Sequence, residues 1–323
     1  MLPHLGRSIV RTVYPDAFLE VPSTVANDAL KPPIFLLGNV RSGTSMMHDL
    51  FDQHPEVTSW YEPRTVWTYA APARAHDIFD ASDATPRVRK YIRKRFLQRQ
   101  REHGDLRVME KTPSNLLRIP YVRAIFPESK YLYMVREPLA YLSSSELKWR
   151  TPISVARAVH RMKETPKTQL PYYLARFARD HFRRKVLKRR HVSVWGVRYP
   201  GIMDDVKALT AEEVIAKQWV ACSQQARKDL AELGDDVVIR MRYEDFVADP
   251  VNQFERILNH FDLQMTDALA THLRSTVDPG RQQKWKRLDP EVVARCLPIL
   301  EDEMATHGYT VPDEIELPSQ TSS

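Results

Sequence analysis

The sequence predicts an α/β fold in three layers, with a parallel sheet at the centre and helices packed on it. Four short, largely apolar runs are the candidate strands, at residues 34–37, 107–111, 131–135 and 237–241. Helical patterns separate these runs, which is typical of βαβ units and a parallel sheet. Polar or charged residues follow the last three runs directly, and such sheets bind ligands beyond the carboxyl ends of their strands. The sequence therefore predicts a polar site at that edge.

The chain is predicted to form one domain with an extension at each end. The domain covers residues 31–312 and includes a mainly helical insertion at about 146–232. Residues 1–30 are expected to be a loose arm and residues 313–323 a disordered tail. No internal repeat and no Gly/Ser-rich linker divides the chain into independent units.

The composition is that of a soluble globular protein, with 43% hydrophobic and 28% charged residues among 323. No apolar run approaches the ~20 residues that span a bilayer, and the N-terminal stretch has no signal-like apolar core. Cys222 and Cys296 lie far apart and imply no disulfide framework. We therefore expect a soluble protein in a reducing compartment, the cytoplasm.

Two windows carry the basic character of the chain. Residues 87–101 contain eight Lys/Arg and no acid, and residues 176–190 contain eight Lys/Arg and one acid, although the whole chain has a net charge of only +7. Both windows have helical apolar spacing, so they fit solvated amphipathic helices. They also fit a surface that attracts an anionic ligand, an anionic substrate or a membrane. No recognisable nucleic-acid-binding module accompanies them.

Residues 33–45 (PIFLLGNVRSGTS) contain the most informative motif. Gly38 and Gly43 have the spacing of a phosphate-binding P-loop, but Thr44 stands where nucleotide triphosphatases have lysine. Ser45 then opens an amphipathic helical stretch, so the loop offers backbone N–H groups and a helix N-terminus to an anion. Arg41 supplies the main positive charge. The motif predicts a phosphate-bearing ligand, and it argues against ATP as a donor of its γ-phosphate.

A second anion-binding motif follows the strand at 131–135. Arg136 ends that strand, Pro138 suits the start of a helix, and Ser144 lies eight residues after the arginine. An arginine and a hydroxyl that converge would bind a second phosphate, with a bidentate guanidinium pair. The structural alternative is that Arg136 caps a neighbouring helix or pairs with Glu137.

Together the two motifs resemble the sulfotransferases that use 3′-phosphoadenosine 5′-phosphosulfate (PAPS). The first resembles the loop that binds the 5′-phosphosulfate, and Arg136 with Ser144 resembles the motif for the 3′-phosphate. Further matching segments follow in the family's order, at residues 109–115, 242–263, 280–288 and 306–309. The resemblance covers roughly residues 33–309 and points to the bacterial or carbohydrate-directed members. It implies a fold like that of P-loop-containing nucleotide hydrolases, PAPS as donor, 3′-phosphoadenosine 5′-phosphate (PAP) as product, and no metal.

The resemblance also implies roles for individual residues. Arg41 and the loop amides would hold the 5′-phosphate and stabilise the charge that grows on the leaving oxygen. Lys111 would be a second cation near the sulfonate, although a surface salt bridge with Glu110 is an alternative. Arg281 would be a further ligand of the 3′-phosphate. The loop amides are those of Ser42, Gly43, Thr44 and Ser45.

An acceptor hydroxyl would also need a general base. Small-molecule members of the family use a histidine after the lysine, and this chain has Lys111-Thr112-Pro113 instead. Glu62 resembles the E-P glutamate that serves as base in bacterial and carbohydrate-directed members. We expect three flanking aromatic residues to raise the pKa of Glu62 by desolvation and to stack on a sugar ring. These are Trp60, Tyr61 and Trp67.

Other assignments remain open at the level of the sequence. Glu62 could be a capping or salt-bridged residue, in which case His48 or His54 would be the rival bases, although each has a structural explanation. The sequence favours transfer of a sulfuryl group from PAPS to a hydroxyl of a carbohydrate, glycolipid or other small metabolite. A P-loop kinase or nucleotide triphosphatase and a non-catalytic anion-binding protein are the alternatives. The sequence does not determine the oligomeric state.

Overall fold

A computed structural model describes most of the chain between residues 30 and 312. The described residues are 30–149, 165–166, 169, 171–175, 178–179, 196–277, 286, 288–312 and 315. Four predictions therefore lie outside them wholly or in large part: the arm at 1–30, the tail at 313–323, the basic window at 176–190, and Arg281. Much of the predicted insertion, residues 150–164 and 180–195, lies outside them as well.

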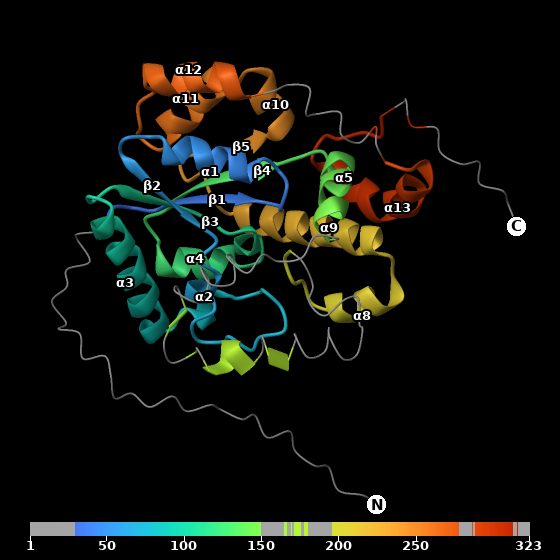
Figure 1. Ribbon diagram of the computed structural model, residues 1–323, viewed down its shortest axis with the longest axis horizontal. Coiled ribbons are helices and arrows are strands. Elements are labelled where there is room, and N and C mark those ends of the chain that lie inside the picture. The colour runs from blue at the N-terminus through green and yellow to red at the C-terminus, as the bar shows by residue number, and fades with distance from the viewer. Residues whose placement is uncertain are drawn as a thin grey trace, which may run out of the picture.

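A five-stranded sheet in the order β2-β3-β1-β4-β5 forms the centre of the molecule, and all its strand pairs are parallel (Figure 1). The predicted α/β class with a parallel sheet is confirmed. The strands are β1 (Ile34–Gly38), β2 (Val57–Tyr61), β3 (Arg107–Lys111), β4 (Lys130–Val135) and β5 (Val238–Arg242).

Four of these strands match the predicted apolar runs, and β2 was not predicted. The segment of β2 mixes polar and apolar residues (VTSWY), so it lacks the apolar run by which the other strands were recognised. It is nevertheless a buried edge strand that pairs with β3 in parallel. This position matters for the site, because Tyr61 lies beside Lys111 across the pair.

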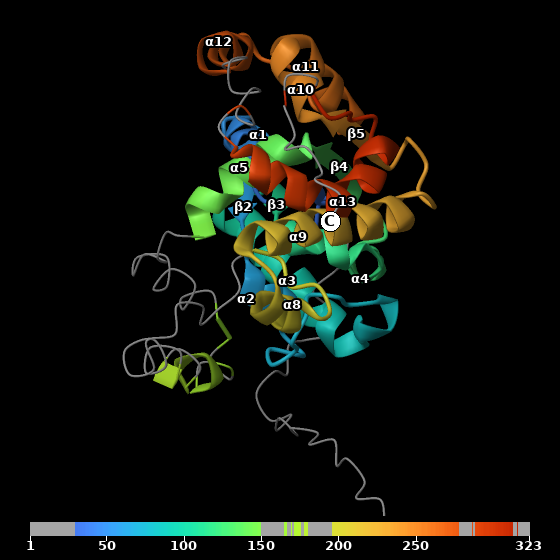
Figure 2. The same cartoon turned by 90° about the vertical axis from the view of Figure 1, so that its right-hand side faces the viewer.

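Helices cover both faces of the sheet (Figures 1 and 2). They are α1 (Thr44–Asp52), α2 (Arg64–Trp67), α3 (Pro86–Glu102), α4 (Ile119–Ile125), α5 (Pro138–Trp149), α8 (Ile202–Ala208), α9 (Ala211–Leu230), α10 (Tyr243–Ala248), α11 (Pro250–His260), α12 (Asp267–Thr276) and α13 (Pro290–Thr306). Two short 3₁₀ helices, η2 (Ala81–Asp83) and η3 (Pro113–Leu117), complete the described elements.

The alternation of side chains along β1 explains the three layers. Ile34 and Leu36 enter one core with α1, α10, α11 and α12, whereas Phe35 and Leu37 enter the other with α3, α4, α5, α9 and α13. Since all four side chains are buried, β1 reads as a continuous apolar run, as expected of a central parallel strand. Within the predicted insertion, α9 places Trp219 and Cys222 in the second core, so this helix is part of the sheet's main packing.

Local sequence signals begin several of the helices. The hydroxyl of Thr85 accepts the Val88 amide before α3, and Thr210 forms a capping box with Glu213 before α9. The side chain of Asp289 accepts the Glu291 amide before α13. The N-terminus of α1 differs, since its N-cap is Gly43 and no side chain caps it. The first N–H groups of α1 therefore have no side-chain cap.

Candidate functional site

Two glycines allow the chain after β1 to turn tightly into α1. Gly43 has φ +85°, and a Cβ built there would lie 2.4 Å from Cδ2 of Tyr243. A Cβ at Gly38 would lie 2.6 Å from the Thr44 methyl group and 2.8 Å from the Met134 carbonyl oxygen. Arg41, between them, has φ 69°, a left-handed conformation uncommon for a residue with a side chain. The loop therefore requires glycine at both positions.

The backbone amides at the start of α1 are those of the loop's last residues. The first N–H groups of an α-helix have no acceptor within the helix, and α1 has no acidic residue in its first turn. The Ser42 amide differs from the prediction, because it donates to the Asn39 carbonyl at 3.1 Å and so shapes the loop. Asn39 is itself fixed by its side-chain amide, which donates to the Ser223 hydroxyl of α9 at 3.2 Å. Gly43, Thr44 and Ser45 lie where a helix N-terminus binds anions.

Arg41, Arg136 and Ser144 converge at this end of α1. The Nε of Arg41 donates to the Ser144 hydroxyl at 2.9 Å, and Nη1 of Arg136 donates to the Arg41 carbonyl at 2.9 Å. Burial and the charge of Arg136 lower the pKa of Arg41, against a smaller opposite effect of Tyr61. Among the residues that the structure describes, no carboxylate forms an ion pair with Arg41. Two guanidinium groups are thus held close together where an anion would neutralise them.

Glu137 explains how Arg136 and Ser144 come to share one place. Its carboxylate accepts the Leu139 amide at 2.7 Å and the Ala140 amide at 2.5 Å, so it caps α5. Burial raises its pKa to about 7, against these two hydrogen bonds. The cap starts α5 directly after β4, and Ser144 then faces the Arg41 side chain two turns later.

A second cluster lies at the carboxyl ends of β2 and β3. Nζ of Lys111 donates to Oε1 of Glu62 at 3.1 Å, while Nη2 of Arg64 donates to Oε2 at 2.8 Å. The Lys111 Nζ also lies 4.2 Å from the centre of the Tyr61 ring. Glu62 has φ 51°, and its amide donates to the Lys111 carbonyl at 2.9 Å, so the backbone turns sharply to present this carboxylate.

The pKa of Glu62 differs from the prediction. Burial alone would raise its pKa, but the charges and hydrogen bonds of Arg64 and Lys111 outweigh burial and lower the pKa to about 2. The expectation that desolvation by neighbouring aromatic rings raises this pKa is therefore wrong. The ring environment differs too, since Trp60 and Trp67 are buried in the core and only Tyr61, 48% exposed, faces solvent.

Lys111 does not form the surface salt bridge with Glu110 that was the alternative. The two are consecutive residues of a strand, so their side chains leave on opposite faces. Glu110 is fully buried and accepts hydrogen bonds from three neutral groups. The donors are the indole of Trp67 at 3.0 Å, the side-chain amide of Asn115 at 2.7 Å and the hydroxyl of Thr112. Burial raises the pKa of Glu110 to about 7, against these bonds.

The two histidines that were rival bases have structural contacts. Nε2 of His54 lies 2.9 Å from the Gln264 carbonyl, and its Nδ1 accepts the Glu56 amide at 3.2 Å, so both ring nitrogens are engaged. His48 lies closer to the site, with its ring edge-on to Tyr61 at 5.1 Å and its Nδ1 3.1 Å from Asp49. The geometry favours Glu62 over either histidine, because Glu62 alone contacts Lys111.

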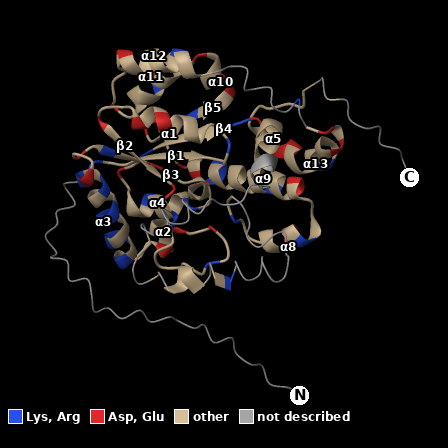
Figure 3. Ribbon diagram, in the orientation of Figure 1, with Lys and Arg blue, Asp and Glu red and all other residues tan. Residues whose placement is uncertain are grey.

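The basic window at 87–101 forms most of α3, on the side of the molecule opposite α5 (Figure 3). Its apolar residues Val88, Ile92 and Phe96 are buried, as the spacing predicts. Lys90, Lys94 and several arginines point to solvent. This basic face is thus not beside Ser144 and the phosphate-type loop.

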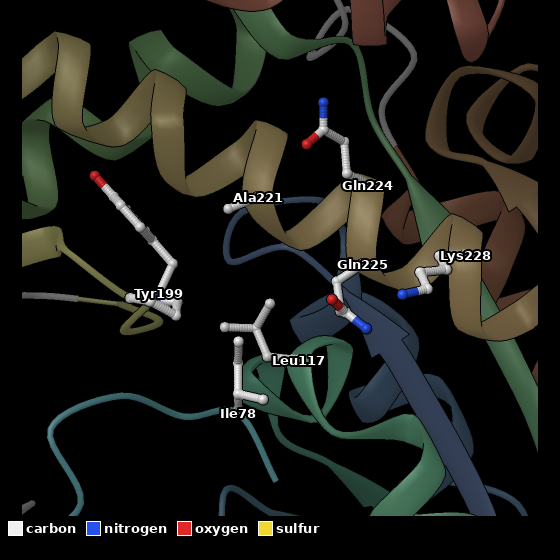
Figure 4. A pocket seen from close by; sticks show the side chains of 8 residues that line it. Ile78, Leu117, Tyr199, Ala221, Gln224, Gln225 and Lys228 are labelled. Atoms are coloured by element: carbon white, nitrogen blue, oxygen red, sulfur yellow. The ribbon is translucent and has the colours of Figure 1, made fainter. Parts of the chain in front are cut away.

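A separate hollow of about 340 Å³ lies beside α9 (Figure 4). Its lining combines aliphatic and amide side chains with one lysine, and none of it belongs to the two clusters described above. The lining residues are Ile78, Leu117, Tyr199, Pro200, Ala221, Gln224, Gln225 and Lys228. Within the described residues, no group of three or more His, Cys, Asp or Glu side chains is arranged to hold a metal ion, and no helix is long and apolar enough to cross a membrane.

A family model described as "Sulfotransferase family" matches residues 32–214 and 193–267. The chain belongs to the sulfotransferase family. Nodulation protein NoeE of Sinorhizobium fredii is 26% identical over 133 residues, which are 36% of this chain and 32% of NoeE. Protein-tyrosine sulfotransferase 2 of Gallus gallus is 31% identical over 123 residues, or 35% of this chain and 33% of that protein. The chain thus aligns with about a third of the length of these curated relatives.

Two solved structures share the sulfotransferase fold. The sulfotransferase domain of the Synechococcus PCC 7002 olefin synthase has a TM-score of 0.53 at 17% identity, over 88% of this chain and 96% of that domain. The sulfotransferase domain from the curacin biosynthetic pathway has a TM-score of 0.51 at 14% identity, over 88% of this chain and all of that domain. The predicted membership of the family is confirmed, as is its fold.

Sequence reasoning identified most of the clustered residues but missed two. Arg64 follows Glu62 by two residues in the motif Glu-Pro-Arg, and that spacing was the available signal. Tyr243 was seen only as part of a matching segment at 242–263, with no role. It contacts both Gly43 and Arg136, and no local pattern shows a contact across such a distance in sequence.

Proposed function

We propose that this protein is a sulfotransferase that moves a sulfuryl group from PAPS to an acceptor hydroxyl. One observation carries the proposal: Arg41 and Arg136 meet at the uncapped N-terminus of α1, next to the carboxyl end of β3 that holds Lys111. Two adjoining anion-binding groups, in contact through Arg41, suit a nucleotide that carries a phosphate on both the 5′ and the 3′ position of its ribose. PAPS would supply the sulfuryl group, and PAP would be the product.

The residues of the loop fit this donor. Gly38 and Gly43 let the turn pack closely against Tyr243 and the Met134 carbonyl, and Arg41 would stand in for the absent P-loop lysine. Thr44 is 2% exposed and packs its methyl group against Gly38, so the helix contributes its amides rather than a long cation. Arg136 and Ser144 would hold the 3′-phosphate. Arg281, outside the described residues, would join them.

Glu62 and Lys111 would carry the chemistry. The acceptor oxygen bonds to sulfur while the bond from sulfur to the bridging phosphate oxygen breaks, and the hydroxyl proton passes to Glu62. Lys111 and Arg41 stabilise the negative charge on the leaving oxygen. Glu62 is ionised at neutral pH, which is the form that accepts a proton. When the sulfonate draws Lys111 away, the carboxylate keeps only Arg64 and its proton affinity rises.

The acceptor is proposed to be a hydroxyl of a carbohydrate, a glycolipid or another small metabolite. The E-P form of the base and the exposed ring of Tyr61 beside Glu62 support this choice, since such a ring can stack on a sugar. A second candidate is the phenolic hydroxyl of a peptide tyrosine. It is favoured by the relatives named protein-tyrosine sulfotransferases, of which the human protein 1 is 28% identical over 138 residues.

Ligand-induced stabilisation tests the donor assignment. We expect PAP to raise the melting temperature of the full chain, and we expect ADP, which lacks a 3′-phosphate, to do so much less. Equal shifts, or none at saturating PAP, would remove the proposal. Turnover of ATP with Mg²⁺ would instead support a kinase or nucleotide triphosphatase. Labelled PAPS offered with sugars, glycolipids, small alcohols and tyrosine peptides would then identify the acceptor class.

We also propose a cytoplasmic location and a peripheral contact of the basic α3 face with anionic membrane. The exposed cations of this helix support the contact, as does its place away from the phosphate-type loop. Binding to anionic vesicles that weakens with salt is expected, because exposed charges are screened. Binding that is insensitive to salt, or equal on neutral vesicles, would contradict it.

A further inference from the structure

We propose that Tyr61 is a positioning residue whose ring holds the ammonium group of Lys111 in place for the sulfuryl group of the donor. The inference rests on the proposed function, because it takes Lys111 as the cation beside the sulfonate. Tyr61 is the last residue of β2 and lies opposite Lys111 in the register of β2 and β3. Residues in register on neighbouring strands point to the same face of the sheet, so the two side chains meet there.

Two contacts fix the ammonium group of Lys111. Its Nζ lies 3.1 Å from Oε1 of Glu62 and 4.2 Å from the centre of the Tyr61 ring. The face of an aromatic ring attracts a cation, and the attraction is stronger where the cation is shielded from water. Lys111 is only 3% exposed, so the ring takes the place of water beside this cation. Unlike Glu62, the ring has no charge, and it therefore holds the ammonium group without neutralising it.

The helix that begins at the phosphate-type loop holds the ring of Tyr61 from another side. Ser59 joins β2 to α1, since its hydroxyl donates to the His48 carbonyl at 3.2 Å and its amide donates to the Asp52 carboxylate at 3.2 Å. Ser59 and Tyr61 lie two residues apart on the strand, so both face α1. The rings of His48 and Tyr61 are 5.1 Å apart and nearly perpendicular, at 88°. The position of Tyr61 is thus set by α1 as well as by β3.

Tyr61 also acts electrostatically on Arg41, the cation of the loop. Burial and the charge of Arg136 lower the pKa of Arg41, and Tyr61 opposes them. Under the proposed function, Arg41 and Lys111 both stabilise the charge on the leaving oxygen, so Tyr61 is near both groups. These contacts leave Tyr61 48% exposed. The ring can therefore meet an acceptor as well, and the experiment has to separate the two roles.

Binding of the donor in the absence of any acceptor separates them. PAPS carries a sulfonate that PAP lacks, and Lys111 is the residue assigned to that sulfonate. If the ring of Tyr61 positions Lys111, its loss weakens the binding of PAPS more than that of PAP. A ring that only stacks on the acceptor leaves both affinities unchanged, and a change that only loosens the fold weakens both alike. The readout is therefore the ratio of the two dissociation constants.

Tyr69 provides a matched control for the loss of a tyrosine ring. It is a partly buried tyrosine that follows α2, and Cζ of Arg87 lies 6.0 Å from the centre of its ring. It therefore resembles Tyr61 in having a cation near its ring. Its ring stacks on that of Tyr91 at 3.7 Å, and none of its described ring contacts is to Lys111. Tyr69→Leu should leave the ratio unchanged.

The experiment titrates the full chain with PAPS and with PAP by calorimetry, without acceptor, and checks that the PAPS is intact after each titration. We expect the wild-type chain to prefer PAPS. Tyr61→Leu should reduce this preference about three- to tenfold, and Tyr61→Phe should keep it within about 1.5-fold, since Phe retains the ring face. Lys111→Met should lose the preference, and Tyr61→Leu added to it should cause little further loss.

The outcomes distinguish this inference from the proposed function. If the wild-type chain binds neither nucleotide, the proposed function fails. If it binds both but does not prefer PAPS, or if Tyr61→Leu keeps the wild-type ratio, only the positioning role is overturned. A loss in Tyr61→Phe as large as in Tyr61→Leu would also overturn it, because the hydroxyl rather than the ring would then matter. An equal loss in Tyr69→Leu has the same consequence. Should Tyr61→Leu not fold, as judged by circular dichroism, Tyr61→Met is measured in its place.

Discussion

Glu62 and Glu110 are both largely buried carboxylates near the ends of adjacent strands, yet their pKa values move in opposite directions. The pKa of Glu62 falls to about 2, and that of Glu110 rises to about 7. Burial raises the pKa of both groups and is the largest effect on each. The difference comes from the partners, since Glu62 has two cations and Glu110 has an indole, an amide and a hydroxyl.

The two faces of the sheet at the end of β3 therefore differ in the kind of partners that their side chains have. The face of Lys111 carries charges, because this buried lysine pairs with the Glu62 carboxylate and lies against the Tyr61 ring. The face of Glu110 carries a closed set of buried hydrogen bonds that has to stay intact. Asn115 links it further, since its carbonyl oxygen accepts Nε of Arg118 at 2.9 Å. The buried hydrogen bonds of Glu110 thus hold β3 in place, and Lys111 leaves the opposite face of the same strand.

The largest effect is expected from Glu62→Gln. The amide has nearly the shape of the carboxylate but cannot accept the proton, so turnover with PAPS should fall by about 10²–10⁴-fold. The affinity for PAP, measured by calorimetry, should change little, because the two phosphate motifs are untouched. A variant that retained more than about a third of the wild-type turnover would show that Glu62 is not the base.

A smaller and purely structural effect is expected from Glu110→Gln. The folded pKa of Glu110, about 7, lies above its ordinary value of 4.5, so the folded protein binds this proton more tightly than the unfolded chain does. Stability should therefore fall as pH rises from about 4.5 to 7, by an amount of order 3 kcal/mol from this group at most. Glutamine does not titrate. In the variant, the free energy of unfolding measured with urea should therefore fall less steeply as the pH rises from about 4.5 to 7.

A second buried carboxylate, Glu137, should still make stability depend on pH in the Glu110→Gln variant. Its pKa is also raised to about 7, so Glu110→Gln should keep the share that Glu137 contributes over the same pH range. The glutamine side chain has one acceptor oxygen, so it can accept the hydrogen bond of Trp67 or that of Asn115 but turns its NH₂ group toward the other donor. The variant should therefore be less stable even at pH 5. An unchanged slope between pH 4.5 and 7 would show that Glu110 is not protonated there.

The smallest effect is expected from Arg64→Gln. Lys111 still holds Glu62 in this variant, so turnover at neutral pH should change by less than about tenfold. The pKa of Glu62 should rise because one of its two cations is lost. The acidic limb of the pH profile of kcat/KM should therefore move to higher pH. A profile that does not move would show that Arg64 leaves the proton affinity of Glu62 unaffected, and Arg74→Gln, at a distant ion pair with Asp83, is the matched control.

The strands and site residues that could be predicted from the sequence are those whose interactions are local in the chain. The strands β1, β3, β4 and β5 are apolar runs followed by polar residues, and all four were recognised. The strand β2 was missed because its burial comes from β3, from α1 and from Phe96 of α3 rather than from an apolar run of its own. Within the site, P-loop-like spacing together with the resemblance to the sulfotransferases indicated Arg41, Gly43, Arg136 and Ser144. The pKa of Glu62 was predicted in the wrong direction, since the neighbouring rings are visible in the sequence and the partnership with Lys111 is not.

The sequence by itself determined the backbone turn of the phosphate-type loop, because the need for a positive φ at Gly43 is local, whereas the close contacts of its glycines with Tyr243 and Met134 are not. A turn with φ of +85° at Gly43 and a helix beginning without a side-chain cap depend on a few consecutive residues. Only the tertiary structure decided which charges meet. Lys111 pairs with Glu62 rather than with its neighbour Glu110 because β2 lies beside β3 and successive side chains of a strand leave on opposite faces. Tyr243 meets Gly43 and Arg136 because the order of the strands brings β5 to β4. These partners are set by strand order, which no single stretch of the chain encodes.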